Sequence, residues 1–526
     1  MTMITNPILP GFHADPSICR VGDDFYIATS TFDWFPGVRI HHSRDLKHWR
    51  HIASPLDRVS LLDLKGNMNS GGVWAPCLSY SDGLFYLIYT DVKQWHGAFK
   101  DTHNYLVTAP SIEGPWSEPI YLNSNGFDPS LFHDDDGRKW LVNMLWDFRK
   151  DRHPFAGIVL QEYSPLEQKL TGPVKMIYEG TEIKLTEGPH LYKRNGYYYL
   201  FVAEGGTQYE HAETVARSKA IDGPYETDPH YPFITAWKKP HLPIQKSGHG
   251  SLVDTPEGEW YFVHLGGRPV NGKYCTLGRE TFIQKAVWTD DDWIRLADGS
   301  QSPSLEVEGP TLPDHPFEAE PVIDDFDDDS LFPGWWNSLR IPMTPDWVSL
   351  TERPGHLRLK GMESMTSLHS QALIARRQTD FQCTIETALD YQPEHFQHMG
   401  GMTVFYDTTD FLYLHITAHP VKGRVLQIMQ MTDGEYDEVL LSPQTITPSG
   451  TVKLKGIIDI DHVQFYYMDQ DTPDWVAIGP ALDVTHMSDD SAPDVRFTGT
   501  FVGMATQDLS GTRKPCDFDY FKYEKK

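Results

Sequence analysis

Three acidic residues that lie far apart in the sequence stand in or beside the same short repeated phrase. Asp15 and Asp128 each begin an Asp-Pro-Ser segment, and Glu187 directly precedes a Gly-Pro-His segment. One such step usually begins only a turn or a strand. Three carboxyl groups held together in a partly dry pocket would raise one another's pKa, which suits hydrolysis by one protonated and one ionised acid. We therefore expect a hydrolytic centre if the fold brings these acids together.

The phrase that contains these acids recurs five times in the first half of the chain. Each copy is followed by a tight-turn signal, such as Gly22-Asp23 or Asn195-Gly196, and then by an aromatic, apolar stretch such as 198–200. Each copy therefore predicts a β-hairpin, and successive copies begin 60, 53, 60 and 61 residues apart. Several strands repeated at that period indicate a β-propeller, here one of five blades.

Equivalent positions of propeller blades converge around the central axis, so the first residue of each copy should face a common cavity. The preceding position adds a tryptophan and an acid. Glu187 lies one residue before the position of the aspartates, so it must reach the cavity by its longer side chain or by a local twist. The predicted group consists of Asp15, Ala75, Asp128, Gly188 and His249, with Trp74 and Glu187 one step earlier.

Beyond the repeats, the sequence predicts a second domain that is also built from strands. Three prolines fall within residues 310–316, a composition typical of a linker. Apolar residues alternate at the strand period in 356–359, 411–416 and 463–467, and helical periodicity is scarce. We therefore predict an all-β chain with a five-bladed β-propeller over 1–308, a linker over 309–316 and a C-terminal β-sandwich over 317–526.

The composition argues against several classes of partner. The chain of 526 residues has 45 Lys and Arg against 73 Asp and Glu, a net charge of −28 that would repel nucleic acid and an anionic membrane. Five scattered cysteines without a CxxC pair predict neither a disulfide framework nor a zinc site. No apolar stretch reaches the ~18 residues of a membrane span, and residues 1–10 lack a signal-peptide pattern, so we expect a cytoplasmic protein.

Several segments carry a resemblance to a known family. They are residues 6–17, 29–32, 34–38, 72–76, 126–130, 186–190, 248–251 and 277–281, together with the tail from 497 to 524. In these segments, which span nearly the whole chain, the sequence resembles the bifunctional β-xylosidases/α-L-arabinofuranosidases of glycoside hydrolase family 43. The resemblance implies an inverting glycoside hydrolase on a five-bladed propeller followed by a β-sandwich.

Carried over residue by residue, the resemblance implies roles for the three acids. Asp15 would be the general base and Glu187 the general acid, while Asp128 would orient Glu187 and hold its pKa up. An inverting reaction needs room for water, so the carboxyl groups of Asp15 and Glu187 should lie roughly 6.5–9.5 Å apart. The resemblance also implies that further residues bind substrate, namely Phe32, Trp74, Trp146, Thr207, His249, Arg279 and Phe497.

Some of these residues also admit other interpretations. On composition alone Phe32 and Trp146 are more often core residues, whereas Arg279 among three carboxylates is a recurrent means of controlling charge. His249 could reach a divalent cation through water, although a neutral hydrogen-bonding histidine is the favoured interpretation. We expect no required cofactor and no metal ligand. A calcium ion at one of the Asp-rich runs, 134–137 or 324–329, is the alternative.

The resemblance implies an exo-acting enzyme that releases xylose from the non-reducing end of xylobiose and short β-1,4-xylo-oligosaccharides, with a side α-L-arabinofuranosidase activity. Two alternatives stay open: an enzyme that is mainly an arabinofuranosidase or arabinanase, and a carbohydrate-binding propeller without turnover. An endo-acting enzyme would need an open cleft. We expect instead that an aromatic of the second domain, Phe497 rather than the core residue Phe501, closes the pocket. The resemblance further suggests a homotetramer.

Overall fold

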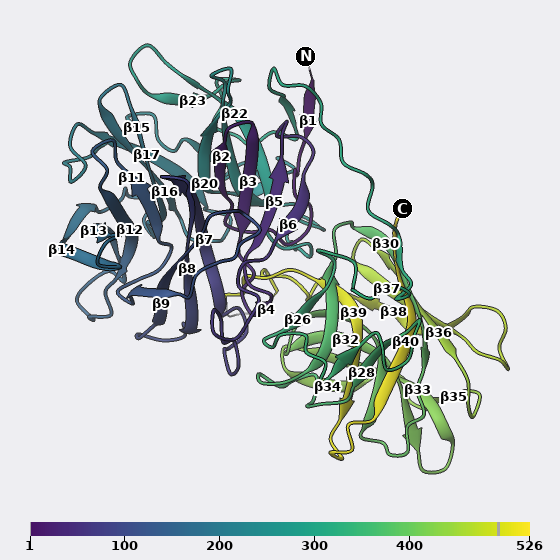
Figure 1. Cartoon of the computed structure of the whole chain (residues 1–526). Coiled ribbons are helices and arrows are strands. Elements are labelled where there is room, and N and C mark those ends of the chain that lie inside the picture. The colour runs from purple at the N-terminus through teal and green to yellow at the C-terminus, as the bar shows by residue number, and fades with distance from the viewer. Residues whose placement is uncertain (1, 492–494) are drawn as a thin grey trace.

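The computed structural model describes residues 2–491 and 495–526. In these residues the regular elements are strands, and no α-helix occurs. The described part of the chain accordingly contains no helix long and apolar enough to cross a membrane. Figure 1 shows two domains side by side, the first built from the N-terminal half of the chain and the second from the C-terminal part. The predicted all-β class is confirmed.

Five antiparallel sheets form the blades of the N-terminal propeller. Blade 1 consists of β2 (Ser17–Val21), β3 (Asp24–Thr29), β5 (Arg39–Ser43) and β6 (Arg50–Ala53). Blade 2 consists of β7 (Gly72–Ser81), β8 (Leu84–Gln94), β9 (Asp101–Ala109) and β10 (Ile120–Asn123). Blade 3 consists of β11 (Ser130–His133), β12 (Lys139–Trp146), β13 (Phe155–Ser164) and β14 (Lys169–Tyr178).

The last two blades follow the same pattern, in which the strands run in chain order from the inner to the outer edge. Blade 4 consists of β15 (Glu187–Arg194), β16 (Tyr197–Glu204), β17 (Ala212–Ser218) and β18 (Glu226–Thr227), and β19 (Ile234–Thr235) also pairs with β17. Blade 5 consists of β20 (Gln245–Asp254), β21 (Trp260–Gly267), β22 (Glu280–Trp288) and β23 (Ile294–Leu296). The predicted five blades are confirmed.

The first strands of the blades close into a ring, because β2, β7, β11, β15 and β20 contact one another in sequence and β20 returns to β2. Serines of the repeated phrase join neighbouring blades. The Oγ of Ser17 accepts a hydrogen bond from the Leu78 N–H at 3.1 Å, and the Oγ of Ser251 accepts one from the Ile18 N–H at 2.8 Å. The repeated phrase therefore both starts each blade and fastens it to the next.

The N-terminal segment supports the ring from outside. Strand β1 (Met3–Thr5) pairs with β24 (Glu306–Glu308) after the last blade. The side-chain amide of Asn6 donates to the Ile283 carbonyl at 2.8 Å and accepts from the Ile283 N–H at 2.9 Å. The two ends of the propeller are thus held together next to blade 5.

Two antiparallel sheets form the C-terminal sandwich. The order of the first sheet is β27 (Val348–Ser349), β28 (Leu357–Lys360), β40 (Pro515–Lys525), β30 (Gln382–Asp390), β36 (Val452–Asp459), β37 (His462–Met468) and β38 (Val476–Asp483), with β25 (Ile323–Asp324) on β40. The order of the second is β34 (Glu435–Glu438), β33 (Gly423–Thr432), β32 (Asp410–His419), β31 (His398–Asp407), β39 (Phe501–Asp508), β29 (Ala372–Arg377), β26 (Asn337–Leu339) and β4 (Trp34–Phe35), with β35 (Gln444–Thr445) on β33. Apolar residues of both sheets pack into one core.

The two domains share a sheet, which the sequence did not predict. Strand β4 belongs to the chain of blade 1, yet it pairs with β26 of the sandwich. The ring of Trp34 in β4 stacks on Phe501 of the sandwich, with centroids 3.8 Å apart. Next to it, Arg340 binds Asp33 at 2.9 Å, and both side chains are buried. Residues 309–322, which contain the predicted linker, carry no strand.

Candidate active site

The first residue of every repeated phrase has a left-handed backbone. The φ angle is 54° at Asp15, 37° at Ala75, 54° at Asp128, 57° at Gly188 and 45° at His249. Residues with a Cβ seldom adopt this conformation, and where they do the surrounding structure must enforce it. All five residues line one small cavity on the axis. The ring predicted from the repeats is therefore present, and the chain turns at the same point in each blade to form it.

Glu187 reaches the same site through an irregularity in its strand. It pairs with Ala203, but the next pair in the ladder joins His190 to Phe201, so β15 contains a bulge at Gly188. A bulge re-aims the neighbouring side chain. The ladder of β7 shifts in the same way after Trp74. The bulge is a local twist, one of the two ways in which a residue one step before the aspartates was expected to reach the cavity.

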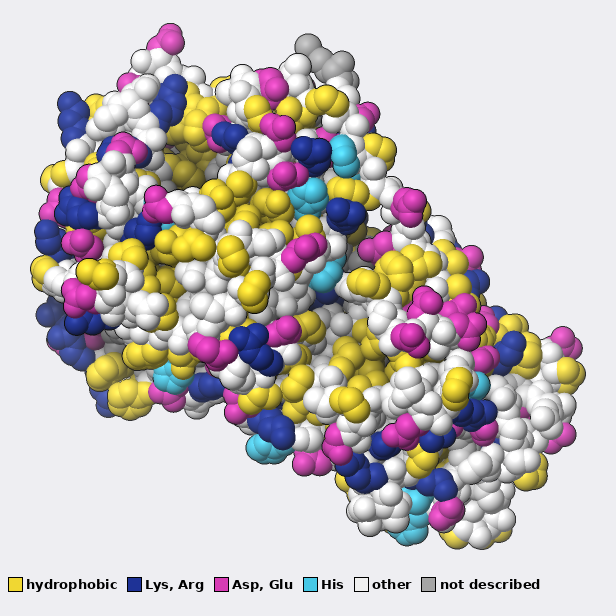
Figure 2. All heavy atoms as spheres, viewed as in Figure 1, with side chains coloured by type: hydrophobic (Ala, Val, Ile, Leu, Met, Phe, Trp, Pro, Cys, Tyr) yellow, Lys and Arg dark blue, Asp and Glu magenta, His cyan; other side chains and the backbone are white. Residues whose placement is uncertain are grey.

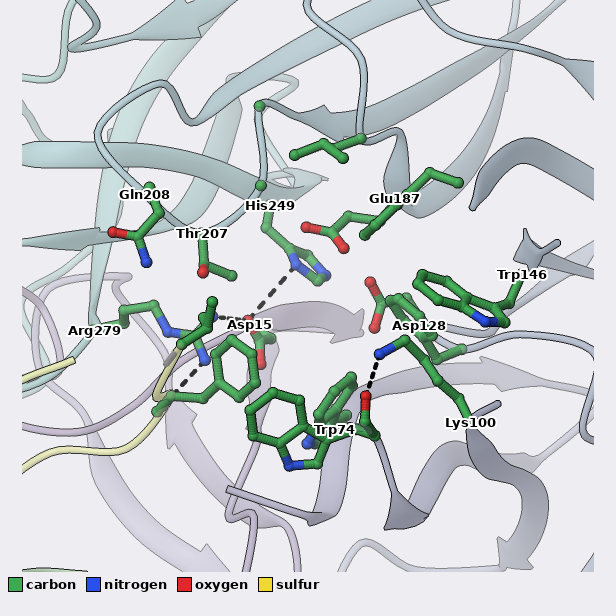
Figure 3. Close-up of a pocket in the computed structure, with 18 of the residues that line it drawn as sticks. Asp15, Trp74, Lys100, Asp128, Trp146, Glu187, Thr207, Gln208, His249 and Arg279 are labelled. Atoms are coloured by element: carbon green, nitrogen blue, oxygen red, sulfur yellow. Dashed lines mark hydrogen bonds and ion pairs between the residues drawn. The ribbon is translucent and has the colours of Figure 1, made fainter. Parts of the chain in front are cut away.

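Above the axis lies a pocket of about 290 Å³, and all ten predicted site residues line it. Figure 3 shows the three acids and His249 directed into this pocket, with Arg279 next to Asp15. Sequence reasoning missed several further lining residues. They include Trp95, Lys100, Phe127, Phe155, Gln208 and Val495.

The carboxyl group of Asp15 is surrounded by donors. The Nη1 of Arg279 donates to its Oδ1 at 2.9 Å, and the Ser30 hydroxyl donates to its Oδ2 at 2.5 Å. The Nδ1 of His249 lies 3.6 Å from Oδ1. Burial alone would raise the pKa of Asp15, but Arg279, His249 and Ser30 together hold it below its ordinary value. Asp15 is therefore ionised at neutral pH, as a general base must be.

The pKa of Glu187 is shifted in the opposite direction, above its ordinary value. Burial and then the negative charge of Asp15 raise its pKa to about 8, while Arg279 and Lys100 oppose the rise. Glu187 is therefore mostly protonated at neutral pH and holds a proton that it can donate. Two carboxyl groups in one pocket thus have opposite protonation states, which is the requirement for paired acid and base catalysis.

Asp128 forms a hydrogen bond with the backbone next to Glu187. Its Oδ2 accepts a hydrogen bond from the Gly188 N–H at 3.2 Å, so it holds the bulge that aims Glu187. Burial, Glu187 and Asp15 raise the pKa of Asp128 well above its ordinary value. The carboxylate that raises the pKa of Glu187 is that of Asp15. The predicted role of Asp128 in orienting Glu187 would act through this hydrogen bond to Gly188. Its predicted effect on the pKa of Glu187 stays a prediction.

Aromatic rings form one wall of the pocket, and one of them comes from the sandwich domain. Phe497 stacks on Phe32 with centroids 5.9 Å apart and meets Trp74 edge-on at 5.3 Å. The Phe497 carbonyl accepts a hydrogen bond from Arg279 Nη2 at 3.1 Å. Phe501, by contrast, is fully buried between the domains. The structure places both phenylalanines where the sequence interpretation expected them.

The opposite side of the pocket carries Trp146 and a lysine. The Nζ of Lys100 lies 4.3 Å from the centroid of the Trp146 ring and donates to the Trp95 carbonyl. Burial lowers the pKa of Lys100 to about 8. Thr207 and Gln208 line the rim between β16 and β17. Lys100 lies outside the repeated phrase, between β8 and β9, so no sequence pattern marked it.

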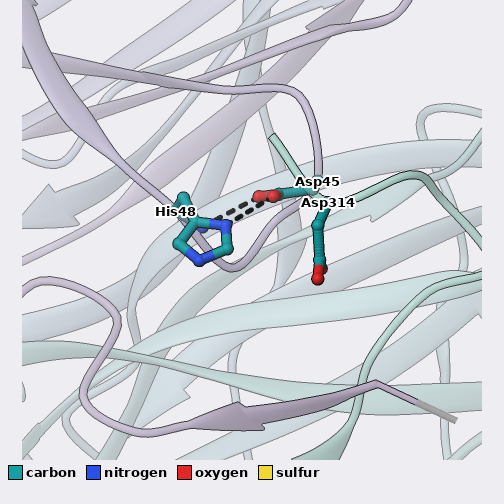
Figure 4. Close-up of side chains that lie close together, drawn as sticks. All are labelled: Asp45, His48 and Asp314. Carbon is teal, nitrogen blue, oxygen red and sulfur yellow. Dashed lines mark hydrogen bonds and ion pairs between the residues drawn. The ribbon is translucent and has the colours of Figure 1, made fainter. Parts of the chain in front are cut away.

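Within the described residues, one group combines carboxylates and a histidine closely enough to hold a metal ion, namely Asp45, His48 and Asp314 (Figure 4). Hydrogen bonds already occupy the carboxylate of Asp45, from His48 Nδ1 at 2.6 Å and the His315 N–H at 2.7 Å. Neither Asp-rich run belongs to this group. Residues 134–137 form the turn between β11 and β12, as the hairpin interpretation expected.

A propeller whose axial pocket holds an ionised aspartate beside a protonated glutamate defines a hydrolase that works with paired carboxyl groups. Comparison with known proteins agrees. Residues 4–294 match the model of the glycosyl hydrolases family 43, and residues 323–524 match the β-xylosidase C-terminal concanavalin A-like domain. The chain belongs to glycoside hydrolase family 43.

Relatives of known structure or name cover the whole chain. A β-xylosidase of Bacillus subtilis (strain 168) is 51% identical over 99% of this chain and 100% of the relative. Xylosidase/arabinosidase 43B of Humicola insolens is 50% identical over 99% of this chain and 98% of its own length. The crystal structure of a xylan β-1,4-xylosidase from Bacillus halodurans C-125 is 69% identical, covers 99% of this chain and 100% of that one, and superimposes with a TM-score of 0.98.

Proposed function

We propose that this chain is an exo-acting, inverting β-xylosidase that releases xylose from the non-reducing end of xylobiose and short β-1,4-xylo-oligosaccharides. The observation that carries the proposal is that the pKa values of two carboxyl groups in one pocket are shifted in opposite directions. The pKa of Asp15 is lowered and that of Glu187 is raised to about 8. The names of the relatives supply the sugar.

The mechanism follows from these protonation states. Asp15 accepts a proton from a water molecule as the water attacks the anomeric carbon. Glu187 donates its proton to the glycosidic oxygen, so the leaving sugar departs neutral. Attack and departure occur on opposite faces of the ring, and the configuration at the anomeric carbon inverts. Arg279 keeps Asp15 ionised until the water is bound.

The shape of the pocket supports exo action. Phe497 and Trp74 close one side of the pocket, and Trp146 with Lys100 limits the other. A pocket bounded on these sides suits the terminal sugar of a short oligomer. Aromatic rings suit the apolar faces of a pyranose.

A side α-L-arabinofuranosidase activity is part of the proposal, because the relative from Humicola insolens is named xylosidase/arabinosidase. The competing hypothesis is an enzyme that acts mainly on arabinofuranosides. Hydrolysis rates on chromogenic β-D-xylopyranoside and α-L-arabinofuranoside separate the two. We expect the xyloside to react with the higher kcat/KM, and a higher value for the arabinofuranoside would reverse the assignment.

The stereochemistry is tested by proton NMR of the sugar first released from the β-xyloside. We expect α-xylose to appear first and to mutarotate afterwards. Initial release of β-xylose would require a covalent intermediate and would overturn the inverting mechanism. A homotetramer, a cytoplasmic location and the lack of a required cofactor stay predictions, for which light scattering, fractionation of cells and dialysis against a chelator are the direct tests.

A further inference from the structure

A second cavity, of about 450 Å³, lies between the two domains, and no residue lines both this cavity and the active-site pocket. We call it the interdomain cavity. Its wall consists of the N-terminal segment around residues 8–13, strands β5 and β6 of the propeller, residues 319–322, strand β29 and the end of β40. It is therefore formed only when the propeller and the sandwich are docked.

The charge of this cavity is opposite to that of the chain. Its lining includes five basic side chains, Arg39, Arg50, Arg376, Arg377 and Lys525, against two acidic ones, Glu320 and Asp380. The whole chain carries a net charge of −28, so this local excess of positive charge runs against the composition. Figure 2 shows basic and histidine side chains at the hollow where the two domains meet.

Three of these arginines are buried without a carboxylate partner. Arg39, Arg376 and Arg377 are only 6%, 7% and 5% exposed. Within residues 2–491 and 495–526, none of the three lies within 4.0 Å of a carboxylate oxygen. The Nε of Arg39, the Nε of Arg376 and the Nη2 of Arg377 also lack any hydrogen-bond partner there.

Histidines with unpartnered ring nitrogens lie on the same wall. The Nε2 of His13 and the Nδ1 of His41 are buried and have no hydrogen-bond partner among the described residues. Burial, and then the neighbouring arginines and histidines, lower the pKa of His13, His41 and His51 well below the ordinary value. These rings are therefore neutral. The Nδ1 of His13 donates to the Pro10 carbonyl at 3.2 Å, so its free Nε2 is an acceptor, whereas His41 can offer one N–H group without adding charge.

Water can satisfy a free N–H group, but it does not neutralise a buried charge. A buried cation without a counter-charge is expensive, and folded proteins normally pair it. Of the other buried arginines, Arg279 and Arg340 follow that rule, since each binds an aspartate at 2.9 Å, whereas Arg424 stands alone as an exception among the described residues. The cavity arginines depart from it together and around one space, so the missing counter-charge is expected inside that space.

We propose that the interdomain cavity binds a small multivalent oxyanion, either a phosphate ester or a polycarboxylate. Guanidinium groups recognise phosphate and carboxylate oxygens in the same bidentate way. The cavity is larger than a phosphate ion, and Trp49, Trp335 and Tyr523 supply an apolar wall for an organic part of the ligand. The anion would contact both domains at once and so stabilise their docking.

The test is calorimetric titration of the full-length protein in a phosphate-free buffer, with inorganic phosphate and with citrate, at constant ionic strength set by sodium chloride. We expect saturable binding of at least one of the two anions and a rise in melting temperature that chloride does not produce. Tighter binding of phosphate would identify the phosphate class, and tighter binding of citrate the carboxylate class. Absence of saturable binding for both would overturn the proposal.

Two variants locate the binding. Arg376→Met keeps an unbranched side chain between the rings of Trp335 and Tyr523, which lie 3.9 and 4.2 Å from the guanidinium. We expect roughly tenfold weaker anion binding or more, with no loss of melting temperature in the absence of the anion. Arg50→Gln at the exposed rim should weaken binding by a few-fold without any effect on folding.

The matched control is Arg424→Met. Arg424 belongs to the same sheet as Arg376, is also buried and has unpaired nitrogens, but does not line the cavity. This variant should bind the anion as the unmodified protein does. Unchanged binding in both Arg376→Met and Arg50→Gln would overturn the assignment to this cavity. A lower melting temperature for Arg376→Met alone, with binding intact, would do the same, because it would show a purely structural arginine.

Discussion

The active-site pocket and the interdomain cavity both hold buried charges, but they balance them differently. In the pocket, Arg279 is paired with Asp15, and the remaining acids, Asp128 and Glu187, are driven towards their neutral forms. In the cavity, Arg39, Arg376 and Arg377 have no carboxylate oxygen within 4.0 Å in the part of the chain that the structure describes. A site whose charges are balanced internally suits a neutral substrate such as a sugar. A site with an uncompensated charge suits a charged ligand.

One short segment connects the two regions. His13 lines the interdomain cavity, and Asp15, two residues later, lines the pocket. The His13 N–H donates to the carbonyl of Arg279 at 2.9 Å, and the Nε of Arg377 donates to the Phe12 carbonyl at 2.6 Å. The backbone that carries the general base is thus held from both sides.

The largest effect is expected for Glu187→Gln, which removes the proton donor but keeps the shape of the pocket. Xylobiose has a poor leaving group, so its kcat should fall by about 10²–10⁴-fold. An aryl xyloside with an acidic phenol needs little protonation and should lose far less. Steady-state rates on both substrates make the comparison.

Gln208→Ala is a suitable control, because Gln208 lines the same pocket but carries no ionisable group. Its effect on the two substrates should be similar. If Glu187→Gln also lowered both rates by the same factor, Glu187 would not be the acid, and the opposite protonation of the two carboxyl groups would lose its meaning for catalysis.

The second effect concerns a paired buried charge outside both sites. Arg340 binds Asp33 and donates to the Asn67 carbonyl at 2.7 Å, so Arg340→Met leaves a buried carboxylate alone. We expect the free energy of unfolding to fall by about 3–5 kcal/mol. Arg376→Met should cost much less, and denaturant unfolding of the two variants sharpens the contrast between paired and unpaired arginines.

The sign of the pH dependence follows from Asp33. Burial raises its pKa to about 6 although Arg340 lowers it, so loss of Arg340 should raise it further. When the pKa of a carboxyl group is raised in the folded state, the free energy of unfolding of the protein falls as pH rises towards that pKa. Arg340→Met should therefore be more destabilising at pH about 8 than at pH about 5. Equal losses at both would contradict the role of the ion pair.

A third prediction uses the pH profile of catalysis. Because the pKa of Glu187 is raised to about 8, kcat/KM on xylobiose should fall above that pH as the acid loses its proton. The charge of Lys100 lowers the pKa of Glu187, so Lys100→Met should move the alkaline limb to higher pH. Lys93→Met, outside the pocket lining, is the control and should leave the limb in place. A limb that stays fixed in Lys100→Met would contradict this coupling.

The repeated phrase explains why so much of the site could be predicted. Each Asp-Pro or equivalent step marks the start of a blade, and the propeller brings these starts together. The convergence of residues 15, 75, 128, 188 and 249 therefore follows from the repeat alone. For Glu187 the sequence left open whether a longer side chain or a local twist brings it into the cavity, and the bulge at Gly188 appears only in the strand ladder. The substrate-binding roles of the aromatic residues were predicted from the family resemblance.

The remaining features depend on how the domains dock. Strand β4 pairs with β26, which is about 300 residues away in the chain, and no local pattern encodes that pairing. The arginines of the interdomain cavity come from β5, β6 and β29, where each occupies an ordinary strand position. Lys100 lies in a loop outside the repeats. Only the assembled structure shows that the arginines meet in one cavity and that Lys100 lies in the active-site pocket.

The smallest effect is expected for Phe497→Ala, and it tests whether the sandwich belongs to the active site. Phe497 packs against Phe32, Trp74 and Trp95, so its loss removes one wall of the pocket while the domain core around Phe501 is retained. We expect kcat/KM for xylobiose and xylotriose to fall roughly fivefold to tenfold, mainly through KM, with little change in melting temperature. Phe396→Ala, an exposed phenylalanine of the sandwich, is the control and should change nothing. Unchanged kcat/KM values for both oligomers in a stable Phe497→Ala variant would show that the sandwich only supports the propeller, and the pocket would then be a property of one domain while the interdomain cavity alone required two.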